Sequence, residues 1–139
     1  MTHVASIGLD VHARTVSACA FDPFTGEAET GKFGPDPPPT TAGIAAWARG
    51  FESPKAVYES GHTGFALCRR LRALGVGCVV GAVSRMQRPA AERRRWHDGR
   101  DAAFLARLLA TRNVVEVWVP PLEVEAARDL SRALDDARE

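Results

Sequence analysis

Four acidic residues stand at positions from which their carboxylates could act together. Asp10 follows the apolar run "SIGL" and Glu59 follows "AVY", so each lies where a predicted strand ends. Asp98 and Asp101 are three positions apart at the start of a predicted helix, a spacing that places both on one helix face. Open α/β sheets bind their ligands at the carboxyl ends of the strands. If the two strands are parallel neighbours, we expect the four carboxylates to converge at that edge.

Such a cluster has a defined chemistry. Carboxylates that face one another without a cation raise one another's pKa, so the cluster is costly unless positive charge neutralises it. Ligands that are all oxygen favour Mg²⁺, with Mn²⁺ as a substitute, over zinc. Two such ions can activate a nucleophile and stabilise the leaving oxygen in phosphoryl transfer. The four acids therefore predict a metal site that acts on phosphate esters.

Each acid also has an ordinary structural explanation. Asp98 and Asp101 are typical of a helix N-cap followed by a favourable charge in the first turn. Asp10 is a common turn-starting residue type, and Glu59 is an unremarkable charge at a strand end. Taken singly, each of these explanations is as good as a functional one. The combination of all four favours the shared site.

The elements that must position these acids change character along the chain. Short β-suited runs dominate the first part, and strand and helix patterns alternate after the proline-rich segment "GPDPPPTT". The predicted strands cover residues 3–11, 15–22, 27–34, 55–60 and 76–83, and the predicted helices cover 42–51, 64–75, the stretch from Asp98, and 122–139. The first three strands predict an antiparallel meander. The later strand, helix and strand predict a parallel β-α-β unit, and the segment "VVEVWVPP" is expected to be short and extended.

Positive charge is concentrated in one part of the chain. Residues 69–112 contain eleven arginines and three acids, whereas the rest contains seven basic and fourteen acidic residues. The planar arginine fork suits phosphate oxygens, so a polyanion such as DNA is the expected partner. The alternative is a solvated helical face. The residues predicted to bind nucleic acid are Arg85, Arg88, Arg93, Arg94, Arg95, Trp96 and Arg100, although Trp96 is equally typical of a core position.

Composition restricts the class of protein. The chain has 139 residues, of which 45% are hydrophobic and 25% charged, as in one ordinary globular domain. Its three cysteines are scattered without metal-binding or disulfide spacing, which is typical of reduced thiols. The sequence shows no secretion signal and no apolar run long enough to span a bilayer. We therefore expect a cytoplasmic protein without a membrane partner.

Four stretches, taken in order and spacing, resemble a known family. They are "IGLDVH", "VYESGHTG", "HDGRDAAFLARLL" and "VWVPPLEVEAARDLSRALDDARE". They are similar to the N-terminal domain of the DEDD transposases, a family that includes Piv-type DNA invertases and bridge-RNA-guided insertion-sequence recombinases. The resemblance covers essentially the whole chain. It departs from the family before the third acid, where Trp96 and His97 replace a basic and a small polar residue, and at Gly99, which weakens the first helical turn.

The resemblance implies a fold and an activity. The fold would be α/β and ribonuclease H-like (RuvC-like), with a mixed five-stranded sheet in the order 3-2-1-4-5, flanking helices and an extended C-terminal helix. The Asp-Glu-Asp-Asp tetrad would be Asp10, Glu59, Asp98 and Asp101, with Mg²⁺ as cofactor, DNA as partner and in some members a guide RNA. Residues 1–119 would form the catalytic domain, and residues 120–139 would begin a helical linker. A second domain, which carries a nucleophilic serine in the family, would be needed for recombination.

Other functions remain open at this stage. The chain could be a non-catalytic remnant that binds nucleic acid or forms dimers. Its final helix repeats Leu122, Ala126, Leu130 and Leu134 at helical spacing, which predicts a homo-oligomer formed through that helix. A sugar-kinase-like ATPase lobe would need D-x-G after the first strand, whereas the sequence has Val11 and His12 there. His12 and His97 neighbour the acids and could contact a phosphate, but simple solvent exposure explains them as well.

Overall fold

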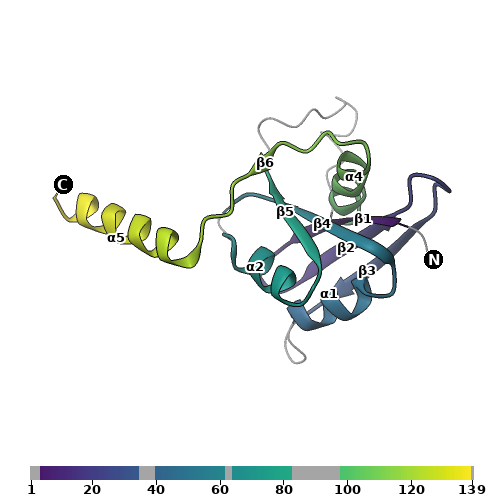
Figure 1. The fold of residues 1–139 in the computed structure, drawn as a ribbon, viewed down its shortest axis with the longest axis horizontal. Helices are drawn as coiled ribbons and strands as arrows, with labels where there is room; N and C mark the ends of the chain where they lie inside the picture. The colour runs from purple at the N-terminus through teal and green to yellow at the C-terminus, as the bar shows by residue number, and fades with distance from the viewer. Residues whose placement is uncertain (1–3, 35–39, 62–63, 83–97, 139) are drawn as a thin grey trace.

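A computed structural model of the chain describes residues 4–34, 40–61, 64–82 and 98–138; in the helix that begins at Asp98, side chains are described from Ala102 onward. The described elements form a mixed β-sheet with helices on both faces and one helix that projects away from it (Figure 1). The expected α/β class is therefore confirmed.

The sheet has the strand order β3-β2-β1-β4-β5-β6. Its strands are β1 (Val4–Val11), β2 (Val16–Phe21), β3 (Ala28–Phe33), β4 (Glu52–Glu59), β5 (Gly77–Gly81) and β6 (Glu116–Val117). The first three form the predicted antiparallel meander. β4 lies parallel to β1 on one side and parallel to β5 on the other. The meander and the β-α-β unit therefore meet at β1 and β4, in the middle of the sheet.

The prediction of five strands is wrong, because the described sheet has six. The additional strand, β6, is two residues long and pairs antiparallel with Val80 and Gly81 of β5. Two residues are too few to show the alternating pattern that identifies a strand in a sequence. The order of the other five strands is as predicted.

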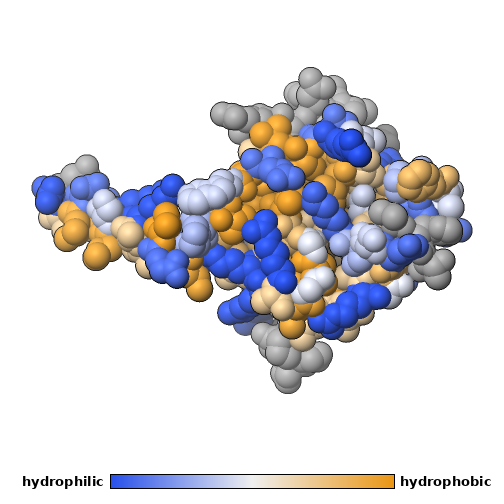
Figure 2. All heavy atoms as spheres, viewed as in Figure 1, coloured by the Kyte–Doolittle hydropathy of each residue, from blue (hydrophilic) through white to orange (hydrophobic). Residues whose placement is uncertain are grey.

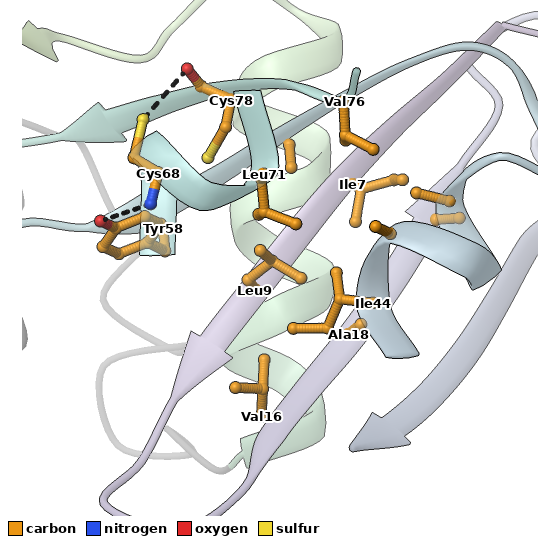
Figure 3. Close-up of a cluster of buried hydrophobic side chains, with 14 of the residues drawn as sticks. Ile7, Leu9, Val16, Ala18, Ile44, Tyr58, Cys68, Leu71, Val76 and Cys78 are labelled. Atoms are coloured by element: carbon orange, nitrogen blue, oxygen red, sulfur yellow. Dashed lines mark hydrogen bonds between the residues drawn. The ribbon is translucent and has the colours of Figure 1, made fainter. Parts of the chain in front are cut away.

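The larger hydrophobic core lies between the sheet and two helices, α1 (Thr40–Ala48) and α2 (Ala66–Ala73) (Figures 1 and 3). Alternation along β1 sends Ile7 and Leu9 into this core, where both are fully buried. Ile44 of α1 and Leu71 of α2 meet them from the other side. On the opposite face of the sheet, α4 (Asp98–Ala110) packs against β1, β2 and β4. The sheet is therefore the middle layer of three.

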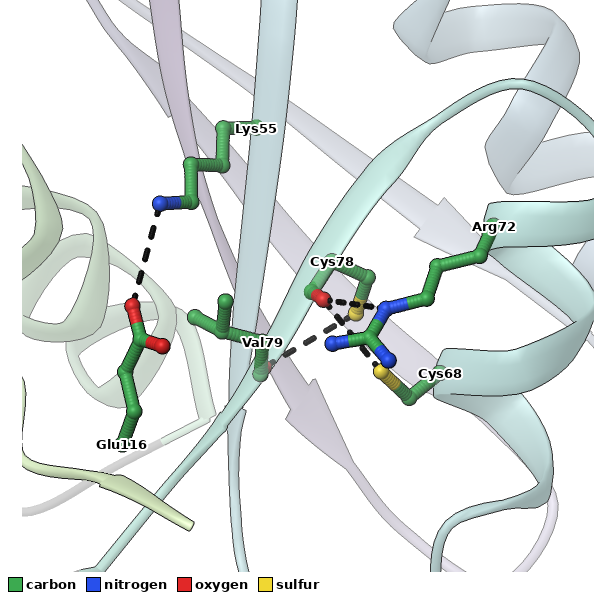
Figure 4. A network of polar contacts seen from close by, with 6 residues as sticks. All are labelled: Lys55, Cys68, Arg72, Cys78, Val79 and Glu116. Carbon is green, nitrogen blue, oxygen red and sulfur yellow. Dashed lines mark hydrogen bonds and ion pairs between the residues drawn. The ribbon is translucent and has the colours of Figure 1, made fainter. Parts of the chain in front are cut away.

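Polar contacts at α2 tie this helix to the sheet. The hydroxyl of the buried Tyr58 donates to the carbonyl of Gly64 at 2.8 Å. The same hydroxyl accepts the amide N–H of Cys68 at 3.3 Å (Figure 3). Arg72 donates to the carbonyl of Cys78 at 2.9 Å (Figure 4). A hydrogen bond with Cys68, together with burial, raises the pKa of the Cys78 thiol. The three cysteines are free, as the sequence indicated, and all three are buried.

The last helix, α5 (Leu122–Arg138), leaves the body of the molecule (Figure 1). None of its described residues is buried, and apolar and polar residues gather on different sides of it (Figure 2). Among the residues that the structure describes, no helix combines the length and apolar character needed to cross a membrane.

Candidate functional site

Asp10 and Glu59 lie side by side on the two central strands. β1 and β4 run parallel, and Leu9 of β1 pairs with Tyr58 of β4. Asp10 and Glu59 are the next residues along each strand, close to the carboxyl end of each. The condition for Asp10 and Glu59 to converge, that these two strands are parallel neighbours, is therefore met. Two of the four predicted site residues consequently occupy one edge of the sheet.

Both residues face the side of the sheet that α4 covers. Leu9 and Tyr58 are fully buried in the core under α1 and α2. Successive residues of a strand point to opposite faces, so Asp10 and Glu59 point away from that core. The Asp10 side chain is only 14% exposed. The pair therefore lies in a partly shielded position at the sheet edge.

Gly8 brings α4 into direct contact with β1. A Cβ atom at this position would lie 1.9 Å from the carbonyl oxygen of Ala102 and 2.6 Å from the amide nitrogen of Ala106. Only glycine leaves room for the helix backbone at this distance. Asp98 and Asp101 lie in the first turn of α4. The next residue is Ala102, whose carbonyl oxygen approaches β1 at Gly8. Asp98 precedes Ala102 by four residues, which is about 6 Å along the helix axis, so the start of α4 is about one turn away from this contact with β1.

The other half of the predicted tetrad remains a prediction. The backbone of Asp98 and Asp101 forms the start of α4, as expected, but their side chains lie outside the described part of the structure. Among the described side chains, no group of three or more histidine, cysteine, aspartate and glutamate residues is arranged to hold a metal ion. The described site is thus a carboxylate pair on the face of the sheet that α4 covers.

His12 contacts this pair directly. Its Nε2 lies 2.9 Å from Oδ2 of Asp10, and its side chain is 42% exposed. The amide of His12 donates to the carbonyl of Thr15 at 2.9 Å, which closes the tight turn between β1 and β2. The sequence placed His12 beside an acid but did not predict this hydrogen bond. The spacing carried a signal, because residues two apart in an extended chain share a face, and His12 directly follows β1.

The predicted nucleic-acid contacts cannot be placed from the described residues. Arg85, Arg88, Arg93, Arg94, Arg95 and Trp96 lie outside them, as does the side chain of Arg100. Two other arginines of the basic segment are used inside the fold. Arg69 and Arg72 donate to the backbone carbonyls of Pro120 and Cys78. Arg69 is only 20% exposed and is therefore less available to a polyanion, whereas Arg72 remains exposed.

Fold and site together define a class of protein: an α/β domain with an acidic pair at the carboxyl ends of its central parallel strands. No family model matches the chain. The chain is 44% identical over 89 residues to the putative transposase y4qE of Sinorhizobium fredii, which is 64% of this chain and 23% of that protein. It is 38% identical over 82 residues to the transposase for insertion sequence element IS1533 of Leptospira borgpetersenii, 58% of this chain and 23% of that protein. The chain is therefore similar to two proteins named as transposases, one of them from an insertion sequence element, and its match spans about a quarter of the length of each.

Proposed function

We propose that this chain is the RuvC-like catalytic part of a DEDD-type transposase that acts on DNA phosphodiesters with Mg²⁺. The observation that carries the proposal is the placement of Asp10 and Glu59 side by side, on the face that α4 covers. The names of the two relatives support a role in transposition. In a ribonuclease H-like arrangement, the start of α4 would add Asp98 and Asp101 to this pair.

The donor set suits a hard divalent cation. Asp10 and Glu59 offer carboxylate oxygens, and Mg²⁺ prefers oxygen ligands. When bound, the cation would polarise a phosphate and favour formation of an oxygen nucleophile. Asp10 and Glu59 would hold it, with Asp98 and Asp101 completing the site. His12, at 2.9 Å from Oδ2 of Asp10, would fix the rotamer of that carboxylate.

The remaining chemistry would come from the rest of a longer protein. The matched segment is 23% of each relative's length. We propose that residues 1–119 form the catalytic domain and that residues 120–139 begin a helical linker to a second domain. That domain would supply the serine nucleophile. Without a positioned nucleophile, metal activation leaves most of the barrier in place, so we expect this chain alone to be inactive in recombination.

Metal binding provides the direct test. We expect the parent chain to bind Mn²⁺ in isothermal titration calorimetry and the Asp10→Asn variant to lose this binding, because asparagine removes a charged ligand while keeping the side-chain shape. Glu29→Gln is the matched control, since Glu29 is an exposed carboxylate on β3, away from the pair. Its titration should resemble that of the parent. Equal Mn²⁺ affinity in the parent and in Asp10→Asn would refute the proposed site.

The basic segment predicts a separate property, binding of DNA and of a guide RNA if one is used. Replacing Arg93, Arg94 and Arg95 together by alanine should weaken DNA binding about 10-fold or more at low salt and flatten its salt dependence, because fewer counterions are released. Asp10→Asn should leave DNA affinity unchanged or slightly higher. Gel-shift titrations over a range of salt concentrations measure both effects. If the triple variant binds DNA as the parent does, the segment is a solvated surface.

A second candidate function is a non-catalytic module that binds nucleic acid or forms dimers. The projecting α5 favours it, because Leu122, Leu130 and Leu134 are 66%, 63% and 53% exposed. A lone helix cannot bury such a stripe by itself. We propose that a second copy of the chain covers it. Loss of Mn²⁺ binding in the Asp10→Asn variant would favour the catalytic role over this one.

A further inference from the structure

The direction of α5 is not set by apolar packing. None of its described residues is buried, although the segment that leads into it is well anchored. Val117 and Val119 pack against the main core, and the Pro120 side chain is fully buried. Pro121 follows and restricts the backbone of Pro120 to extended conformations. The carbonyl of Pro121 accepts the amides of Val124 and Glu125 at 3.0 and 3.1 Å, which begins the helix. The chain therefore reaches the start of α5 at a defined place, but no buried side chain of α5 holds the helix against the domain.

Arg69 of α2 joins this anchored segment to the helix. Its guanidinium donates to the carbonyl oxygen of Pro120 at 2.5 Å and forms an ion pair with the carboxylate of Glu125, in the first turn of α5. The same guanidinium lies 5.8 Å from the ring centroid of Phe65. The side chains of Arg69 and Glu125 are only 20% and 28% exposed, so solvent screens their ion pair less than an open surface pair.

We propose that Arg69 is the positioning residue that fixes the direction in which α5 leaves the domain. The planar guanidinium of Arg69 contacts both the carbonyl of Pro120, before the helix, and the carboxylate of Glu125, within it. Because the guanidinium is rigid, two contacts made by it restrict the angle between the helix and the domain as well as the distance. A second contact also joins α5 to the segment before it, because the guanidinium of Arg128 lies 5.3 Å from the ring centroid of Trp118. That pair is more open, because Trp118 is 61% exposed. Arg69 thereby sets where any segment after α5 lies relative to Asp10 and Glu59.

The proposal is independent of metal binding and can be tested on the full chain with spin labels. Labels are placed at Glu29→Cys on β3 and Ser131→Cys on α5, both exposed positions. The native cysteines are buried, which restricts labelling of the folded protein to the introduced thiols. Dilution with unlabelled chain removes distances between copies. Pulsed dipolar spectroscopy should give a narrow distance distribution in the parent and a distribution at least about twice as wide in the Arg69→Gln variant.

Three further variants complete the test. Arg70→Gln removes the same charge from an exposed position on the same helix and should keep the narrow distribution. Arg69→Lys retains the charge but not the fork, so its distribution should be intermediate. Glu125→Gln changes only α5, is no threat to the core, and should broaden the distribution even if Arg69→Gln fails to fold. If folded Arg69→Gln keeps the parent's distribution, or if Glu125→Gln does so, the proposal is overturned.

Discussion

The Gly8→Ala variant is expected to lose roughly 3 kcal/mol of stability or more, an effect at the upper end of those caused by overpacking. The added Cβ would lie 1.9 Å from the carbonyl oxygen of Ala102, a backbone atom in the first half of α4. A flexible side chain could move aside, but a helix backbone moves only as a whole. The helix must therefore shift away from β1. The same shift would separate the start of α4 from Asp10 and weaken Mn²⁺ binding.

Urea denaturation of both proteins measures the change in stability, and calorimetry measures the change in Mn²⁺ affinity. Gly77→Ala is the control, because Gly77 is also a strand glycine, the first residue of β5, but a Cβ there would be 3.6 Å from its nearest neighbour, the carbonyl oxygen of Pro54. We expect this control to be neutral or slightly stabilising, since glycine is unfavourable within a strand. A Gly8→Ala variant as stable as the control would show that α4 does not rest on β1 at this distance.

A second large effect is expected from the double substitution Leu130→Asp and Leu134→Asp in α5. We expect the parent to associate through this helix, because 63% of Leu130 and 53% of Leu134 are exposed on one apolar stripe. Two buried aspartates would face each other across a symmetric interface, where unpaired charge is costly. The variant should therefore be monomeric at concentrations at which the parent is a dimer. Light scattering over a range of concentrations measures this difference.

The control for this experiment is Ser131→Asp, which adds a negative charge to α5 away from the predicted stripe. It should associate like the parent. A parent chain that remains strictly monomeric at high concentration would contradict the proposed association. So would a double variant that dimerises as tightly as the parent.

Local patterns in the sequence were sufficient for five of the six described strands. The alternation of "VASIGLDV" makes β1 a strand with Ile7 and Leu9 on one face, because the side-chain period of a strand is two residues. Parallel pairing of β4 with β5 follows from the strand-helix-strand pattern and its preferred connection. The adjacency of β1 and β4 was implied only by the family resemblance, through the strand order 3-2-1-4-5. Once these two strands are neighbours, Asp10 and Glu59 must lie at the same edge.

Contacts between residues far apart in the chain were decided only by the tertiary structure. β6 is identified by its pairing with β5, since two residues carry no periodic signal. Gly8 resembles any strand glycine until α4 lies against it, and Arg69 resembles a basic surface residue until Pro120 and Glu125 reach it. A sequence pattern indicates which face of a helix or strand a residue occupies. Which backbone or carboxylate meets that face depends on how all the elements pack, so close approaches and long-range ion pairs appear only in the folded chain.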